Sequence, residues 1–246
     1  MKINKSLILK PVIKLLCLLL IIPILVLIHF FAFPQQTRAI LVDYSGLTKK
    51  GRLYFNPDIA PETIQKVEST ILHADSKLKK FWGNLTSEPK IIYCDNDSDF
   101  KKFGNPFPVP AVTMVKLGTY IVISKSGVDS DIIAHEMSHA EFYQRVGFYN
   151  TTFKVPAWFD EGLAMQVDQR SYYSEAVLKK KSADLKNLPD ITKLFTGQQF
   201  GSGNLDQIML NYMTARYIVK NWYTREKLTK LINNLNNGIA FISAYQ

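Results

Sequence analysis

Residues 135–139 read His-Glu-Met-Ser-His, and their types and spacing predict chemistry more directly than any other part of the chain. Four residues along an α-helix return two side chains to nearly the same face, so His135 and His139 can face one ion. Glu136 lies on the adjoining strip. Neutral imidazoles suit Zn²⁺, and a neighbouring carboxylate can take a proton from water whose pKa a metal has lowered to about 7. The stretch predicts two zinc ligands and a general base.

The same five residues would also occur on an ordinary amphipathic helix with two surface histidines, so the surrounding sequence has to decide. The β-branched and aromatic run at residues 120–124 indicates a strand, and Gly127 then favours a turn. Asp129 is a good N-cap, and Gly147 offers a left-handed C-terminal end. We therefore expect a helix from about Asp129 to Val146 with the motif in its middle.

A catalytic zinc site has three protein ligands and a water, so one more donor is needed downstream. No histidine follows His139. In the pattern H-E-x-x-H-x-x-G-x-x-H the later Gly and His positions are here Phe142 and Arg145, which excludes a third histidine ligand. The missing donor must be a carboxylate.

Residues 156–164 read Pro-Ala-Trp-Phe-Asp-Glu-Gly-Leu-Ala and supply such a carboxylate. Pro156 is well placed to open a helix, and Glu161 then lies one turn into it. Gly162 and Ala164 are small, so we expect this helix to approach the motif helix closely enough for Glu161 to reach the ion. Asp160 is the alternative ligand.

The motif H-E-x-x-H, followed about twenty residues later by W-F-D-E-G-L-A, resembles the gluzincin metallopeptidases, which include thermolysin-like and aminopeptidase-N-like enzymes. The resemblance covers residues 135–169, and the rest of the chain is most similar to small peptidase-MA-like proteins. It implies Glu161 as third zinc ligand, Glu136 as general base and a peptide or protein substrate. Asp160 stands where aminopeptidases often have Asn. The G-x-M-E-N exopeptidase signature is absent, so specificity for a free amino terminus is not implied.

Two further roles depend on residues outside the motifs. Asp168, two turns after Glu161 if the helix continues, could hold a ligand histidine from behind, or it could be a solvated helix-end acid. Tyr212, on a helix expected over residues 204–222, is the first candidate to donate a hydrogen bond to the developing oxyanion, with Arg216 as the second. A core role for Tyr212 is the alternative.

Residues 111–114 and 119–124 predict a β-hairpin directly before the motif helix. In gluzincins an edge strand lies across the cleft and pairs with extended substrate. By that resemblance the hairpin would bind peptide through strand addition, which uses backbone bonds and selects little sequence. A plain sheet edge is the alternative.

The N-terminus predicts a membrane anchor. Residues 1–14 carry four lysines and no acid, and residues 15–33 are apolar except for Pro23 and His29. This length suits a bilayer span. We expect a cytoplasmic basic tail (1–14), an uncleaved single-pass signal anchor (15–33) and an extracytoplasmic domain (34–246) at the cell membrane of a bacterial envelope. A cleaved signal peptide is the alternative.

Composition narrows the function classes. The net charge of the chain is +9, and without the four N-terminal lysines 26 basic residues face 21 acidic ones. The dense run at residues 179–181 suits a solvated helix face or an anionic polymer, and nothing resembles a nucleic-acid-binding module. Cys17 lies in the predicted span and Cys94 is the other cysteine, so residues 34–246 cannot form an internal disulfide.

The whole pattern predicts an α+β, zincin-like metallopeptidase domain of two lobes behind a transmembrane helix. Residues 34–127 would form an α/β lobe with a small mixed sheet, and residues 128–246 a helical lobe, with the zinc cleft between them. The expected function is membrane-anchored, zinc-dependent peptide-bond hydrolysis. The alternatives are a zinc-binding envelope scaffold or chaperone-like protein without turnover, and a structural anchor with an accidental motif. Oligomeric state is open.

Overall fold

The computed structural model describes residue 19 and residues 21–246. Within that part of the chain, five strands form one mixed sheet in the order β1-β2-β3-β5-β4. β2–β3 and β3–β5 pair in parallel, while β1–β2 and β4–β5 pair antiparallel. β4 is therefore an edge strand. The strands are β1 (Thr48–Lys50), β2 (Leu53–Phe55), β3 (Lys90–Cys94), β4 (Ala111–Lys116) and β5 (Gly118–Ser124).

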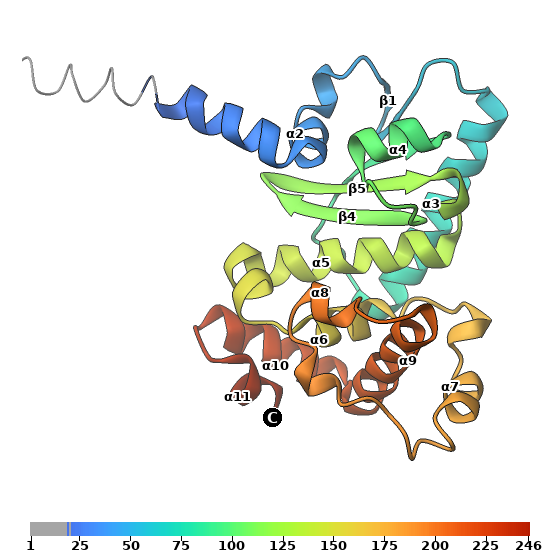
Figure 1. The fold of residues 1–246 in the computed structure, drawn as a ribbon, viewed down its shortest axis with the longest axis vertical. Helices are drawn as coiled ribbons and strands as arrows, with labels where there is room; N and C mark the ends of the chain where they lie inside the picture. The colour runs from blue at the N-terminus through green and yellow to red at the C-terminus, as the bar shows by residue number, and fades with distance from the viewer. Residues whose placement is uncertain (1–18, 20) are drawn as a thin grey trace, which may run out of the picture.

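Helices cover the sheet and continue below it. α2 and α4 lie above the sheet in Figure 1, α5 lies directly below β4, and the later helices pack beneath α5. The helices are α2 (Pro34–Ile40), α3 (Pro61–Trp82), α4 (Asp97–Phe103), α5 (Ser130–Phe153), α6 (Ala157–Ala164), α7 (Glu175–Lys181), α8 (Gly197–Phe200), α9 (Leu205–Trp222), α10 (Arg225–Asn236) and α11 (Phe241–Tyr245). Short 3₁₀ turns are η1 (Val42–Tyr44), η2 (Lys125–Gly127), η3 (Ser171–Tyr173) and η4 (Ile191–Lys193).

The central strands are buried on both faces, which their side-chain alternation explains. Ile91 and Tyr93 of β3 belong to the large core shared with α3, α5 and the C-terminal helices. Ile92 and Cys94 belong to a smaller core that α2 and α4 cover. Because successive strand residues point to opposite faces, a continuous apolar run is what a doubly covered strand requires.

The helix that carries the motif begins as its sequence predicts and bends at a glycine. The carboxylate of Asp129 accepts hydrogen bonds from the backbone N–H groups of Asp131 and Ile132, so Asp129 is the N-cap. Gly147 has φ 78° and ψ 164°, which is not helical, and a further helical stretch follows it up to Phe153. The glycine ends the regular helix where expected, but it produces a kink within α5 and not a C-terminus.

The prediction of a transmembrane anchor is wrong. None of the helices among the described residues is long and apolar enough to cross a membrane. The helix over residues 21–32 stops at Phe33, and α2 begins at Pro34.

This finding corrects the expected fold class, the membrane partner and the cell-membrane location together. The described chain is a mixed α/β structure with one sheet, without the predicted transmembrane helix ahead of it. The predicted cytoplasmic tail over residues 1–14, and residues 15–18 and 20 of the predicted span, lie outside the described residues.

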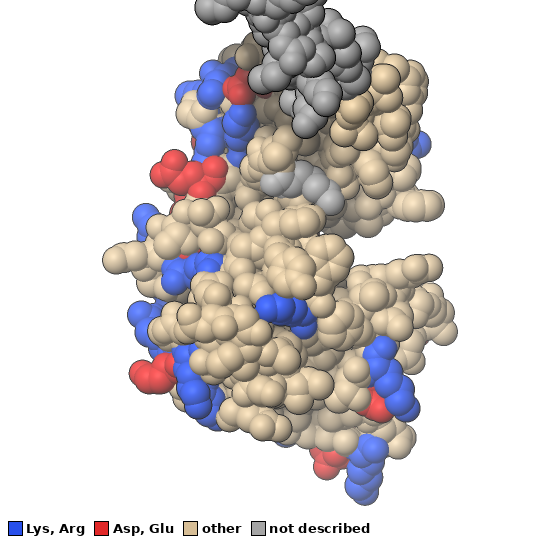
Figure 2. Space-filling model, turned by 90° about the vertical axis from the view of Figure 1, so that its left-hand side faces the viewer, with Lys and Arg blue, Asp and Glu red and all other residues tan. Residues whose placement is uncertain are grey.

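Charge is unevenly spread over the described surface. When the side at the left of Figure 1 is turned to the viewer in Figure 2, most Lys, Arg, Asp and Glu side chains lie toward its edges and the middle is largely without them. Leu41 and Leu117 are exposed and line an apolar groove of about 610 Å³. Apolar side chains are common on protein surfaces, so this groove by itself assigns no function.

Candidate metal centre

Two imidazoles and one carboxylate converge at the centre of the molecule. Nε2 of His135 and Nε2 of His139 are 3.2 Å apart. Oε2 of Glu161 lies 3.3 Å from the first nitrogen and 3.5 Å from the second. An ion held tetrahedrally at about 2.0–2.1 Å keeps its ligand atoms about 3.3 Å apart. The three atoms therefore match three corners of a tetrahedral metal site.

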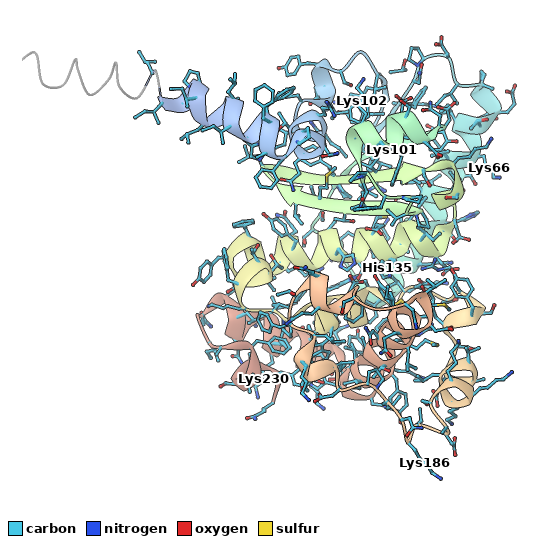
Figure 3. The ribbon with its side chains drawn as sticks, in the orientation of Figure 1. Lys66, Lys101, Lys102, His135, Lys186 and Lys230 are labelled. Carbon is cyan, nitrogen blue, oxygen red and sulfur yellow. The ribbon has the colours of Figure 1, made fainter. Side chains whose placement is uncertain are left out.

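Two helices position these ligands. His135 and His139 are one turn apart on α5, and His135, labelled in Figure 3, lies on the side of α5 that faces the helices below. Glu161 comes from α6, whose N-cap is Pro156. Phe159 of α6 is fully buried in the large core and fixes the rotation of this short helix.

A glycine is required at position 162 for a different reason from the one predicted from the sequence. A Cβ at this position would lie 2.5 Å from Cγ2 of Val219 and 2.8 Å from the backbone oxygen of Ala215. Both residues belong to α9, so the nearest obstacle is α9 and not the motif helix α5. The glycine lets α6 press against α9, which supports Glu161 from behind.

The hydrogen bonding of the cluster fits a bound cation. Oε2 of Glu161 is buried and has no hydrogen-bond donor, and it faces the Nε2 atoms of two histidines. Convergence of acceptor atoms without enough protons between them is unfavourable in a buried place. A metal ion satisfies all three atoms at once, so the residues present fit one.

The electrostatics point the same way. Burial alone would raise the pKa of Glu161, but His139 and His135 lower it well below its ordinary value. Burial lowers the pKa of His139, yet the carboxylates of Asp160 and Glu161 overcome this and raise it well above its ordinary value. The surroundings therefore favour positive charge at the centre.

Asp160 lies behind one ligand and does not join the cluster. Its Oδ2 is 3.1 Å from Nδ1 of His139, on the ring edge opposite Nε2. The two atoms are not aligned as a hydrogen bond, so the contact is electrostatic. Its other oxygen, Oδ1, is buried without a partner. The atoms that converge are those of His135, His139 and Glu161, which places Asp160 as an outer partner and not as the alternative ligand.

Asp168 lies behind the other ligand, at a longer distance. Its Oδ2 is 3.8 Å from Nδ1 of His135. The expectation that it continues the helix of Glu161 is wrong, because α6 ends at Ala164. Asp168 is completely buried and is bound by Arg170, whose Nε donates to Oδ1 at 2.9 Å and to Oδ2 at 3.0 Å. It is therefore not a solvated acid.

Glu136 faces the cleft from α5 and is held by the edge strand. The hydroxyl of Thr113 in β4 donates to Oε2 of Glu136 at 2.7 Å, and the backbone carbonyl of Glu136 is a second acceptor at 2.9 Å. The carboxylate keeps its other oxygen free of protein donors in the described structure. Glu136 thus lies beside the ligands without being one of them.

A cleft of about 630 Å³ contains the centre. Its walls come from β4, α5, α6, η3 and α9, and residues 111–113 and Val115 of the predicted hairpin line it. Tyr212 of α9 also lines it, with its ring centroid 6.2 Å from that of His135. The carboxylate of Glu161, then burial, then Glu136 raise the pKa of Tyr212 well above its ordinary value. Its phenol therefore stays protonated and can donate.

Arg216 does not line this cleft. Its Nη1 donates to the backbone carbonyl of Tyr173 at 3.4 Å. The cleft instead brings in Tyr173 and Arg170, which sequence reasoning missed. Arg170 follows Asp168 by two residues, and that pairing of opposite charges was the one local signal for it. No local signal marks Thr113, because its contact with Glu136 spans 23 positions.

The described residues thus contain a group of two imidazoles and one carboxylate that could hold a metal ion. The base candidate Glu136 and the donor candidate Tyr212 line the same cleft as these ligands. No protein-family model matches this sequence, and none of the curated proteins matches it either.

Proposed function

We propose that this protein is a zinc-dependent metallopeptidase, a gluzincin-like hydrolase of peptide or protein substrates. The observation that carries the proposal is the triangle of ligand atoms with edges of 3.2, 3.3 and 3.5 Å beside a carboxylate that is not a ligand. A purely structural zinc site is closed by four protein ligands. Three ligands with a base next to them favour a site that is open to substrate.

The donor set favours zinc among the divalent metals. Two imidazole nitrogens and one carboxylate oxygen, spaced for tetrahedral geometry, are typical ligands of catalytic zinc, whereas magnesium and calcium prefer oxygen ligands and higher coordination. When bound, zinc would lower the pKa of water in the cleft and polarise the carbonyl of the scissile bond.

The protein side chains would then handle the protons. Glu136 accepts a proton from the attacking water as the water oxygen bonds to the carbonyl carbon. Glu136 then passes that proton to the amide nitrogen as the C–N bond breaks, so the products are one carboxylate and one amine. The hydrogen bond from Thr113 keeps the carboxylate aimed into the cleft. Tyr212 donates a hydrogen bond to the carbonyl oxygen as negative charge develops on it.

Substrate backbone would bind along β4. This strand pairs with β5 on one side only, and its residues line the cleft. An extended peptide can add to such an edge through main-chain hydrogen bonds. The placement of β4 next to Glu136 supports this role for the hairpin.

The test combines metal analysis with peptide cleavage. The purified protein is expected to hold one zinc per chain and to cleave a mixed peptide library. Glu136→Gln is expected to keep the zinc and lose about 10²–10⁴-fold in kcat/KM, the usual contribution of a general base. Glu62→Gln changes an exposed glutamate of α3 and serves as the matched control.

Two results would contradict the proposal. Full activity in Glu136→Gln would exclude the assigned base, and absence of zinc would exclude the centre. Zinc without cleavage of any peptide would favour a metal-binding scaffold without turnover.

A further inference from the structure

Two hollows of the protein share lining residues beside the metal group. The larger, of about 630 Å³, extends along β4 and the first half of α5. The smaller, of about 300 Å³, is lined by the end of α5 at Thr151 and Thr152 and by Thr196 and Gly197 beside α8. Both hollows are lined by Asp160 and Glu161. A peptide bond placed at the ligands therefore has room for chain on both sides.

The acidic groups of the two hollows are already engaged. An enzyme that removes residues from an amino terminus needs a free carboxylate to hold the terminal ammonium. Among the described residues, the acids that line the hollows are Glu136, Asp160 and Glu161. Glu136 accepts from Thr113 with one oxygen, and in the proposed mechanism its other oxygen takes the proton of the attacking water. Glu161 faces both histidines, and Asp160 has one oxygen buried and the other 3.1 Å from Nδ1 of His139. The acids of the hollows therefore have other roles than holding a terminal ammonium.

The basic group is engaged as well. A carboxypeptidase needs a cation that can bind the terminal carboxylate, usually in a fork. Arg170 is the cation among the described residues that line the two hollows. Its Nε binds Asp168, and its Nη1 donates to the hydroxyl of Tyr172 at 2.7 Å. Its charge is already neutralised by a buried carboxylate, so it is a poor anchor for a chain end.

We infer that the substrate is an internal peptide bond of an extended chain, so that the enzyme is an endopeptidase. The inference rests on the proposed function and specifies the substrate class of the same site. Two hollows that share Asp160 and Glu161 as lining residues, and the absence of a charge available to a chain end among their described lining residues, support this inference. Chain ends are neither required nor recognised.

The first experiment uses zinc-loaded protein and two sets of peptides. One set has eight or more residues with acetylated amino and amidated carboxyl ends. The other has the same sequences with free ends, together with aminoacyl p-nitroanilides and short carboxypeptidase substrates. The blocked peptides are expected to be cleaved at internal bonds, with kcat/KM within about threefold of the free ones, because no terminal charge pair is lost. Products are mapped by mass spectrometry.

The outcomes distinguish a failure of the endopeptidase inference from a failure of the proposed metallopeptidase function. Cleavage confined to free-ended peptides, with one or two terminal residues released, would overturn the endopeptidase inference and leave the metallopeptidase proposal intact. No zinc-dependent cleavage of any peptide would refute the proposed function, and the inference with it.

A second experiment fills the smaller hollow. Gly197 lines it, and a Cβ there would meet no atom within 4 Å, so the side chain of Gly197→Trp would begin in open space. This variant is expected to lose at least about tenfold in kcat/KM for long blocked peptides, the size of a few lost apolar contacts. Peptides trimmed on one side of the scissile bond should escape the loss. Gln198→Trp, on the exposed neighbour, is the matched control.

Equal cleavage of long peptides by Gly197→Trp and Gln198→Trp would show that substrate does not enter the smaller hollow and would contradict the two-sided cleft. Zinc content and circular dichroism of both variants establish that they are folded.

Discussion

Glu141 and Glu161 are both glutamates with buried carboxylate oxygens, but their surroundings differ. Glu141, on α5, is completely buried and accepts from the backbone N–H groups of Thr86 and Ser87, from the Thr86 hydroxyl at 2.8 Å and from Nε of Arg145 at 2.7 Å. Glu161 offers Oε2 to two imidazole nitrogens and has no hydrogen-bond donor there. One acid is surrounded by donors and the other by potential metal ligands.

The difference separates a structural acid from a functional one. A buried charge persists in a fold when donors or an opposite charge compensate its lost hydration. Glu141 obtains both from the protein itself, and so joins the loop after α3 to α5. Glu161 faces two histidines that lower its pKa, and a bound cation could compensate its carboxylate and both imidazole nitrogens together. The same residue type therefore predicts stability in one place and metal binding in the other.

The largest effect on stability is expected from removing Glu141, the acid whose carboxylate is surrounded by donors. Glu141→Ala leaves two backbone N–H groups and the guanidinium of Arg145 without their acceptor, so the free energy of unfolding should fall by about 3–5 kcal/mol. Urea unfolding measures this. Glu88→Ala, at an exposed position of the same loop, should change it by less than about 0.5 kcal/mol. A loss below 1 kcal/mol in Glu141→Ala would mean that the donors find water instead.

Asp168 shares features of both glutamates. Like Glu141 it accepts hydrogen bonds from an arginine, here Arg170, and like Glu161 it lies next to a ligand histidine. Arg170→Met should cost about 3 kcal/mol at pH 7, the low end for a broken buried pair, since the backbone N–H of Arg170 still donates to Asp168. Burial would raise the pKa of Asp168, but the hydrogen bonds from Arg170 lower it below its ordinary value.

The sign of the pH dependence follows from that lowered pKa. A carboxyl whose pKa is lowered by folding adds stability above its unfolded pKa of about 3.9, and this stability is lost as pH falls through the folded pKa. The difference in unfolding free energy between wild type and Arg170→Met should therefore be full at pH 7 and shrink in acid. Urea unfolding at pH 7 and in steps downward from pH 4 tests this, and a gap that widens as the pH falls would contradict it.

Zinc should change the stability of the protein through Glu161, whereas replacing Glu161 in the metal-free protein should change that stability little. Zinc at 100 times its Kd should stabilise the wild type by about 2.7 kcal/mol. Glu161→Gln should lose that stabilisation at the same zinc concentration, while the metal-free variant unfolds within about 1 kcal/mol of the metal-free wild type. Thermal unfolding with and without zinc measures both. If metal-free Glu161→Gln were as unstable as Glu141→Ala, Glu161 would be a structural acid.

Asp160 should show a smaller effect on the metal. Outer partners of ligand histidines typically contribute 10–100-fold in metal affinity. Asp160→Asn removes the charge 3.1 Å from Nδ1 of His139, so zinc affinity should fall by about that factor in competition with a chelator. Asp58→Asn, an exposed change of the same kind, should leave it unaltered. Equal affinities in the two variants would show that Asp160 does not support the ligand.

Local signals in the sequence predict the elements around this centre well. The strand expected over residues 120–124 lies within β5, and the expected start of the motif helix is capped by Asp129. An apolar run between turns, and a capping residue before a helix, act within a few neighbouring positions. The two histidines share a face of α5 because four residues nearly complete a helical turn.

Contacts between distant segments explain what the sequence could not predict. The hydroxyl of Thr113 reaches Glu136 only because β4 pairs with β5 in one register. Gly162 faces α9, more than fifty positions later in the chain. Hydropathy alone predicted a bilayer span over residues 15–33, whereas none of the helices in the described part of the chain is long and apolar enough to cross a membrane.

The smallest effects are expected from two threonines that donate hydrogen bonds to glutamates of α5. Thr86 binds Glu141, and Thr113 binds Glu136. Each hydroxyl donates to a carboxylate, at 2.8 Å and 2.7 Å respectively. Thr86→Val should cost about 1 kcal/mol of stability, the net value of one hydrogen bond, with cleavage unchanged. Thr113→Val should cost less in stability, because Glu136 lines an open cleft and water can replace the donor.

The same Thr113→Val change should nevertheless slow peptide cleavage several-fold, because the carboxylate loses the contact that aims it at the substrate carbonyl. Zinc content should stay at one per chain, and KM should change less than kcat. Urea unfolding and steady-state kinetics of Thr86→Val and Thr113→Val measure these effects on stability and cleavage. If Thr86→Val slowed cleavage as much as Thr113→Val, both threonines would act through the rigidity of α5, and the separation between its structural and functional acids would not hold.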